Sequence, residues 1–113
     1  MIGKRATRSM TPQALSEREG VDIIDVREAD EWRAGHIAGS RHIPMGTIGN
    51  RLHELDGDRP IVAVCRSGQR SGQVTALLAK QGYDITNLDG GLRAWARGGL
   101  PLATAVGGQG RVI

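Results

Sequence analysis

The segment that decides the fold reads IVAVCRSGQRSGQVTALLAK and covers residues 61–80. Its first four residues are all apolar, which is typical of a strand covered on both faces in a parallel sheet. Further along, apolar side chains recur at the spacing of one helix face, at Val74, Leu77 and Leu78. The segment therefore predicts a buried strand, a short glycine-bearing loop over residues 65–70, and an amphipathic helix over residues 71–81.

Strands and helices alternate on both sides of this segment. Apolar runs predict further strands over residues 21–26, 40–43 and 83–88. Capping signals and helical spacing predict helices over residues 12–19, 28–34, 47–55 and 92–97. This alternation predicts an α/β fold with a central, mainly parallel sheet and helices on both of its faces.

Length and charge indicate a single domain with distinct ends. The chain has 113 residues and a formal net charge of +3, but residues 11–100 hold 11 Lys or Arg against 12 Asp or Glu. We therefore expect a flexible basic tail over residues 1–8, one domain over residues 9–101, and a glycine-rich tail over residues 102–113. Aromatic residues are few and none is interleaved with a basic stripe, so nucleic-acid binding is not expected.

Cysteine usage and hydropathy exclude several other classes of protein. The single cysteine excludes an internal disulfide and a multi-cysteine metal site. No apolar run approaches the roughly 20 residues that a membrane-spanning helix needs, and no secretory leader is recognisable at the start of the chain. We expect a cytoplasmic monomer that uses no metal or cofactor and binds no membrane.

The loop that begins at Cys65 has the composition of an anion-binding site. A short loop with a central glycine can turn its backbone N–H groups inward, and the dipole of the helix that follows adds positive potential. Arg66 and Arg70 place two permanent cations within five residues of the sulfur. These groups favour thiolate over thiol, so we expect the pKa of Cys65 to lie below its free value of about 8.5. Such a thiolate suits nucleophilic chemistry on an anionic substrate, as in a cysteine phosphatase, whereas no histidine lies in a motif that would make it the base of a cysteine protease.

Three separated motifs resemble those of the single-domain rhodaneses, a family of sulfurtransferases. The motifs are Asp25-Val-Arg27-Glu28 with Glu31-Trp32 and Gly35-His36-Ile37-Ala-Gly39-Ser40, then Cys65-Arg-Ser-Gly-Gln-Arg70-Ser71, and finally Asp89-Gly90-Gly91 with Trp95. The resemblance covers residues 9–101 and implies a rhodanese-like fold. It also implies a small anionic sulfur donor such as thiosulfate and an acceptor that is cyanide in vitro and a thiol or partner protein in the cell.

The resemblance assigns a role to each residue of the loop. Cys65 is expected to carry the sulfur as a persulfide. The substrate-binding residues it implies are Arg66, Ser67, Gly68, Gln69 and Arg70. Of these, Arg66 is expected to contact the sulfonate end of thiosulfate, and the backbone N–H groups to cradle the sulfur. The residues expected to brace the loop are Asp25, Arg27 and Ser71, the first two through ion pairs that can include Arg70.

Two other functions stay open at the level of sequence. A rhodanese domain can serve as a non-catalytic docking or sensor module, although such modules usually lack the cysteine that this chain keeps. Phosphatases and arsenate reductases of rhodanese-like fold carry one more loop residue, in the pattern Cys-x-x-x-x-x-Arg. Cys65 and Arg70 follow the shorter pattern Cys-x-x-x-x-Arg, which favours sulfur transfer.

Overall fold

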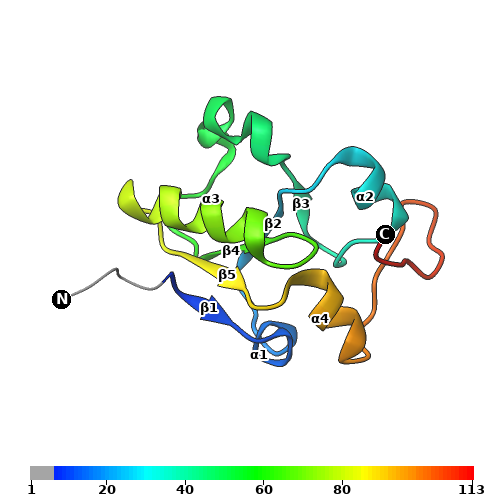
Figure 1. Ribbon diagram of the computed structural model, residues 1–113. Helices are drawn as coiled ribbons and strands as arrows, with labels where there is room; N and C mark the ends of the chain where they lie inside the picture. Colours follow the sequence, from blue (N-terminus) through cyan, green and yellow to red (C-terminus); the bar gives the residue numbers. More distant parts are fainter. Residues whose placement is uncertain (1–6) are drawn as a thin grey trace.

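Five parallel strands form the centre of the computed structural model, which describes residues 7–113 (Figure 1). The strands are β1 (Ser9–Met10), β2 (Asp22–Asp25), β3 (Arg41–His42), β4 (Ile61–Val64) and β5 (Ile85–Leu88). They lie in the order β1-β5-β4-β2-β3, and every neighbouring pair is parallel. β4 is therefore the central strand, as its uniformly apolar sequence predicted.

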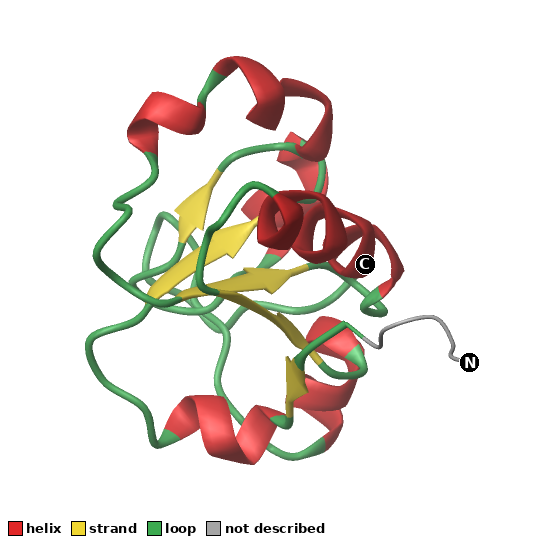
Figure 2. Cartoon of the chain, turned by 90° about the vertical axis from the view of Figure 1, so that its left-hand side faces the viewer, coloured by secondary structure: helices red, strands yellow, loops and turns green. Residues whose placement is uncertain are grey.

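Helices cover both faces of the sheet (Figure 2). They are α1 (Pro12–Ser16), α2 (Ala29–Ala34), α3 (Gln69–Lys80) and α4 (Gly91–Arg97), together with the 3₁₀ helices η1 (Met45–Asn50) and η2 (Leu52–Glu54). Side chains alternate across β4, so that Ile61 and Ala63 pack in the core beneath α3 and η1. Val62 and Val64 pack in the core beneath α1 and α4. The predicted α/β class, with a parallel sheet between two helical layers, is confirmed.

Residues 47–55 do not form the single α-helix that the sequence predicted. The two 3₁₀ helices η1 and η2 occupy this part of the chain, with Arg51 between them. Gly49 and the β-branched residues before it disfavour a regular α-helix. The segment nevertheless buries Ile48 and Leu55 against the sheet. The spacing of its apolar residues therefore predicted the buried residues correctly but the type of helix incorrectly.

The buried face of α3 also differs from the predicted one. Leu77 is 52% exposed, whereas the buried residues of this helix are Ser71, Val74, Thr75 and Leu78. These four recur at the three- and four-residue spacing of one stripe, and Leu77 lies outside it. The prediction that Leu77 belongs to the core face is therefore wrong, and two polar side chains, Ser71 and Thr75, are buried in its place.

The segment beyond Pro101, predicted to be a glycine-rich tail outside the domain, packs on the domain. Ala103 forms antiparallel bridges with His36 and with Gln109, and the Arg111 N–H donates to the carbonyl of Ala34. At the other end, residues 1–6 of the predicted basic tail lie outside the described residues. No helix in residues 7–113 is both long enough and apolar enough to cross a membrane.

Candidate active site

The loop after β4 is held by contacts with the start of α4. The Leu92 N–H donates to the carbonyl of Cys65 at 2.8 Å, and the Arg93 N–H donates to the carbonyl of Arg66 at 3.0 Å. A Cβ on Gly91 would lie 2.5 Å from the Arg66 carbonyl oxygen, and Gly91 has a φ of 63°. Only glycine accommodates both this φ and this close backbone approach, which explains the third sequence motif physically.

Hydrogen-bond donors from the beginning of α3 converge on the sulfur of Cys65. The Gly68 N–H donates to Sγ at 3.1 Å and the Ser71 N–H at 3.4 Å. The Ser71 hydroxyl oxygen lies 3.2 Å from the same sulfur. Gly68 adopts a left-handed φ of 98°, which lets the chain turn these groups inward as the helix begins. The thiol lies at the floor of the loop, with no exposed surface.

Two opposing effects set the pKa of the Cys65 thiol. Burial disfavours the thiolate and raises the pKa, while hydrogen bonds from the Ser71 hydroxyl and from the backbone of Ser71, Gly68 and Ser67 lower it. The hydrogen bonds prevail, so the pKa of Cys65 lies below its ordinary value. The expected direction is confirmed: the inward-turned backbone N–H groups lower the pKa as the sequence predicted, and the Ser71 hydroxyl lowers it most.

Arg70 is tied to α2 rather than to the end of β2. Its two terminal nitrogens donate to the two carboxylate oxygens of Glu31, each at 2.8 Å. This bidentate bond from Arg70 is the main cause that lowers the pKa of Glu31 to about 2. The expectation that Asp25 and Arg27 could pair with Arg70 is therefore corrected, because Glu31 occupies that position.

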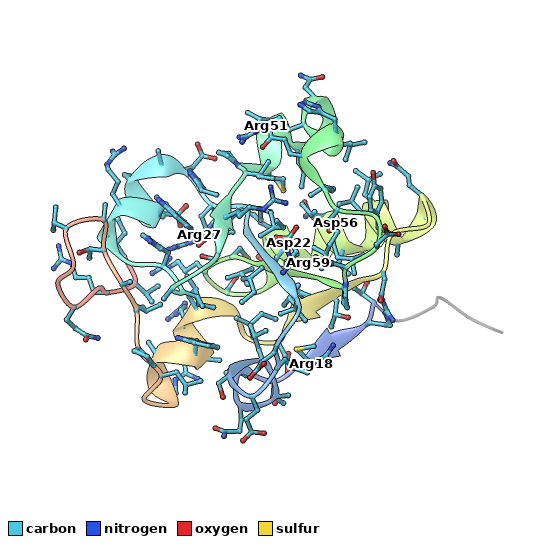
Figure 3. All side chains as sticks on the ribbon, turned by 180° about the vertical axis from the view of Figure 1, so that it is seen from behind. Arg18, Asp22, Arg27, Arg51, Asp56 and Arg59 are labelled. Atoms are coloured by element: carbon cyan, nitrogen blue, oxygen red, sulfur yellow. The ribbon has the colours of Figure 1, made fainter. Side chains whose placement is uncertain are left out.

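Asp25 and Arg27 instead pair with each other inside the protein. The Arg27 Nε donates to Asp25 Oδ1 at 2.9 Å, and Nη2 donates to Oδ2 at 2.8 Å and to the Gly35 carbonyl at 2.7 Å. Both side chains are buried, and Arg27 lies beside α2, at the opposite end of β2 from Asp22 (Figure 3). Val26 N–H donates to the Val64 carbonyl at 2.9 Å, so this pair stands next to the strand that delivers Cys65.

Three residues near this rim form a stack of flat rings. The centroid of the Trp32 ring lies 3.6 Å from that of the His36 ring and 5.0 Å from that of the His42 ring, and its plane is nearly parallel to both. His36 Nδ1 lies 2.8 Å from the Trp32 carbonyl oxygen, and His42 Nε2 lies 2.7 Å from that of Arg27. Both histidines thus serve local backbone groups, and residues 7–113 contain no group of three His, Cys, Asp or Glu placed to hold a metal ion.

The remaining residues that the sequence assigned to the loop lie at its mouth. Arg66, Ser67 and Gln69 are exposed, where they can meet a molecule that approaches the sulfur. Two further residues of the site received no role from sequence. Glu31 lay inside the first motif, but nothing in the sequence around it indicates that its partner is Arg70, 39 positions away. Asn87 of β5 lies in no motif, so the sequence did not indicate that it belongs to the site.

Similar proteins place this site in a known family. The Rhodanese-like domain family matches residues 12–98. A protein named "Sulfurtransferase" from Allochromatium vinosum is 43% identical over 108 residues, which are 95% of this chain and 100% of the relative. "Thiosulfate sulfurtransferase GlpE" from Pseudomonas putida is 35% identical, over 82% of this chain and 84% of the relative. The crystal structure of a rhodanese-related protein from Thermoplasma volcanium superposes with a TM-score of 0.82 at 30% identity, covering 85% of this chain and 97% of that one.

Proposed function

This chain belongs to the rhodanese-like family, and on that premise we propose that it is a sulfurtransferase of the thiosulfate sulfurtransferase type. The observation that carries the proposal is the convergence of Gly68 N–H, Ser71 N–H and the Ser71 hydroxyl on the single cysteine. A sulfur so placed is a stabilised nucleophile beneath an anion-binding loop. The names of the similar proteins support the same activity.

Sulfur transfer at this site balances without an added oxidant or reductant. The Cys65 thiolate attacks the outer sulfur of thiosulfate, a new S–S bond forms, and the S–S bond of thiosulfate breaks with its electron pair leaving on sulfite. The enzyme then carries a Cys65 persulfide whose outer sulfur is anionic. A thiophilic acceptor, either cyanide or a thiolate, takes that outer sulfur and returns the thiolate.

The loop supplies a different group to each part of this reaction. Backbone N–H groups from Arg66 to Arg70 are suited to hold the anionic outer sulfur, because they open the N-terminal end of a helix of 12 residues. Arg66 is exposed at the mouth, where its guanidinium can bind the sulfonate oxygens of thiosulfate. The Glu31–Arg70 bond fixes the far end of the loop.

Mass spectrometry tests this function directly. After incubation with thiosulfate, we expect the protein to gain one sulfur atom on Cys65 and to release sulfite. Cys65→Ser, which keeps a small polar side chain at the same position, should show neither change, and cyanide should remove the added sulfur as thiocyanate. Hydrolysis of an aryl phosphate without any sulfur adduct would instead establish the phosphatase chemistry.

A further inference from the structure

Asn87 closes a ring of polar contacts around the thiol. Its Nδ2 donates to the Gly68 carbonyl at 3.0 Å, and its Oδ1 lies 2.5 Å from the Ser71 hydroxyl oxygen. Gly68 and Ser71 both donate hydrogen bonds to Cys65 Sγ. Asn87 of β5 therefore bonds to two residues that hold the sulfur, and its recorded hydrogen bonds go to these residues rather than to the sulfur.

The orientation of the Asn87 carboxamide follows from its partners. The Gly68 carbonyl can only accept a hydrogen bond, so the NH₂ end of the carboxamide must face it. The oxygen end must then face the Ser71 hydroxyl. Since Oδ1 can only accept, the Ser71 hydroxyl proton has to point at Asn87 for this contact to be a hydrogen bond.

One proton therefore has two competing acceptors. The Ser71 hydroxyl carries a single hydrogen, yet it lies within hydrogen-bond distance of both Asn87 Oδ1 and Cys65 Sγ. When Cys65 is a thiol, its S–H can donate to the Ser71 oxygen while Ser71 donates to Asn87, so every group is satisfied. When Cys65 is a thiolate, the sulfur can only accept, and the Ser71 proton can serve the sulfur only by leaving Asn87.

We propose that Asn87 is a positioning residue that holds the Ser71 proton whenever Cys65 Sγ is uncharged and releases it to Sγ when the thiolate forms. Asn87 then opposes ionisation of the free thiol, while Ser71 supports it. Ser71 is fully buried, so water does not replace either partner in the described structure, and the competition is settled between these two acceptors.

The consequence for catalysis rests on the proposed sulfurtransferase function. In the persulfide, the negative charge lies on the outer sulfur, and Sγ is a neutral sulfur bonded to carbon and sulfur. The Ser71 proton can then return to Asn87, and the hydrogen bond lost in the thiolate is regained. Asn87 thus favours the sulfur-loaded enzyme over the free thiolate, so this carboxamide helps drive the first half-reaction.

Other charges near the sulfur do not depend on this ring. Arg70, from α3, interacts electrostatically with Cys65, and it is held by Glu31 of α2. The Gly68 carbonyl keeps a second donor, the Gly72 N–H at 2.9 Å, when Asn87 is removed. A change at Asn87 should therefore act on the sulfur through the Ser71 proton.

The test is the pH dependence of Cys65 alkylation by iodoacetamide, which is unambiguous because the chain has one cysteine. We expect Asn87→Ala to lower the apparent pKa of the thiol and Ser71→Ala to raise it, each by about half to one unit. In the Ser71→Ala background, Asn87→Ala should cause no further change. Asn87→Asp, which keeps an acceptor beside Ser71 and adds a charge, should raise the pKa.

Thr86→Ala provides the matched control, because Thr86 is the adjacent polar residue of β5 and points to the opposite face; its thiol pKa should equal that of the parent protein. The proposal would be overturned if Asn87→Ala raised the apparent pKa of the Cys65 thiol. It would also be overturned if Asn87→Ala shifted that pKa equally in the parent protein and in the Ser71→Ala variant. In mixtures of thiosulfate and sulfite at a pH above the pKa of the thiol, Asn87→Ala should also lower the ratio of persulfide to free thiolate several-fold. If no persulfide forms on any variant, the sulfurtransferase function fails, while the alkylation result still decides the role of Asn87.

Discussion

Two arginine–carboxylate pairs flank Cys65, and they differ in almost every physical respect. Asp25 and Arg27 are two residues apart, fully buried, and tied to the backbone of Gly35. Glu31 and Arg70 are 39 residues apart, partly exposed, and join α2 to the loop that begins at Cys65. The first pair is part of the buried interior at the end of β2, and we call it the framework pair. The second pair, which we call the clasp, links α2 to the loop and is accessible to protons from solvent. Two neighbouring ion pairs at one site can therefore have separate roles: the buried pair stabilises the fold, and the partly exposed pair holds the loop in place.

Removing one partner of the buried pair should give the largest effect. Arg27→Met leaves the Asp25 carboxylate buried without its main partner, and we expect the free energy of unfolding to fall by about 3 to 5 kcal/mol. Urea denaturation measures this change. The double variant Asp25→Leu with Arg27→Met should recover part of the loss, because it leaves no uncompensated charge. If Arg27→Met were as stable as the parent protein, the claim that the buried Asp25–Arg27 pair stabilises the fold would be wrong.

A third arginine sharpens the comparison, because Arg66 forms no ion pair within residues 7–113 and is exposed. If it binds the sulfonate, Arg66→Ala should lower kcat/KM for thiosulfate by about 10- to 100-fold and affect an uncharged sulfur donor much less. Steady-state kinetics with both donors check this. Arg18→Ala, at an exposed arginine of the segment between α1 and β2, is the matched control. Equal losses for the two donors would argue against sulfonate binding.

The Glu31–Arg70 clasp should make the stability of the protein depend on pH in the acid range. The pKa of Glu31 is lowered from 4.5 to about 2 by its bond with Arg70, so its stabilising contribution is complete above about pH 4.5 and is lost as pH falls towards 2. Glu31→Gln should therefore be less stable at neutral pH and should lose less stability than the parent protein across that window. Denaturation midpoints from pH 2 to 7 measure both the stability at neutral pH and its loss in acid. Glu54→Gln breaks the pair with Arg51, in which the carboxylate is more exposed than that of Glu31, and should change this slope less. A larger change would contradict the role of the Glu31–Arg70 pair.

Local patterns predicted the parts of the fold whose causes are local. The uniformly apolar β4 has the bounds that its sequence indicated. A helix was predicted from residue 12, and Thr11, directly before it, caps α1 by accepting a hydrogen bond from the Ala14 N–H at 3.1 Å. β1 was not predicted, because two residues carry no periodic signal. Leu77 was assigned to the wrong face, because spacing alone does not show which side of a helix meets the sheet.

The sequence by itself determined the α/β class, the position of Cys65 after a buried strand, and the glycine and arginine residues of the loop that follows. These features depend on residues within one strand, turn or helix, where spacing and residue type act directly. The tertiary structure alone decided that Arg70 bonds to Glu31 and that Ser71 is shared between Cys65 and Asn87. The Glu31–Arg70 and Ser71–Asn87 contacts join residues far apart in the chain, and their geometry exists only after the sheet brings β4, β5, α2 and α3 to one edge.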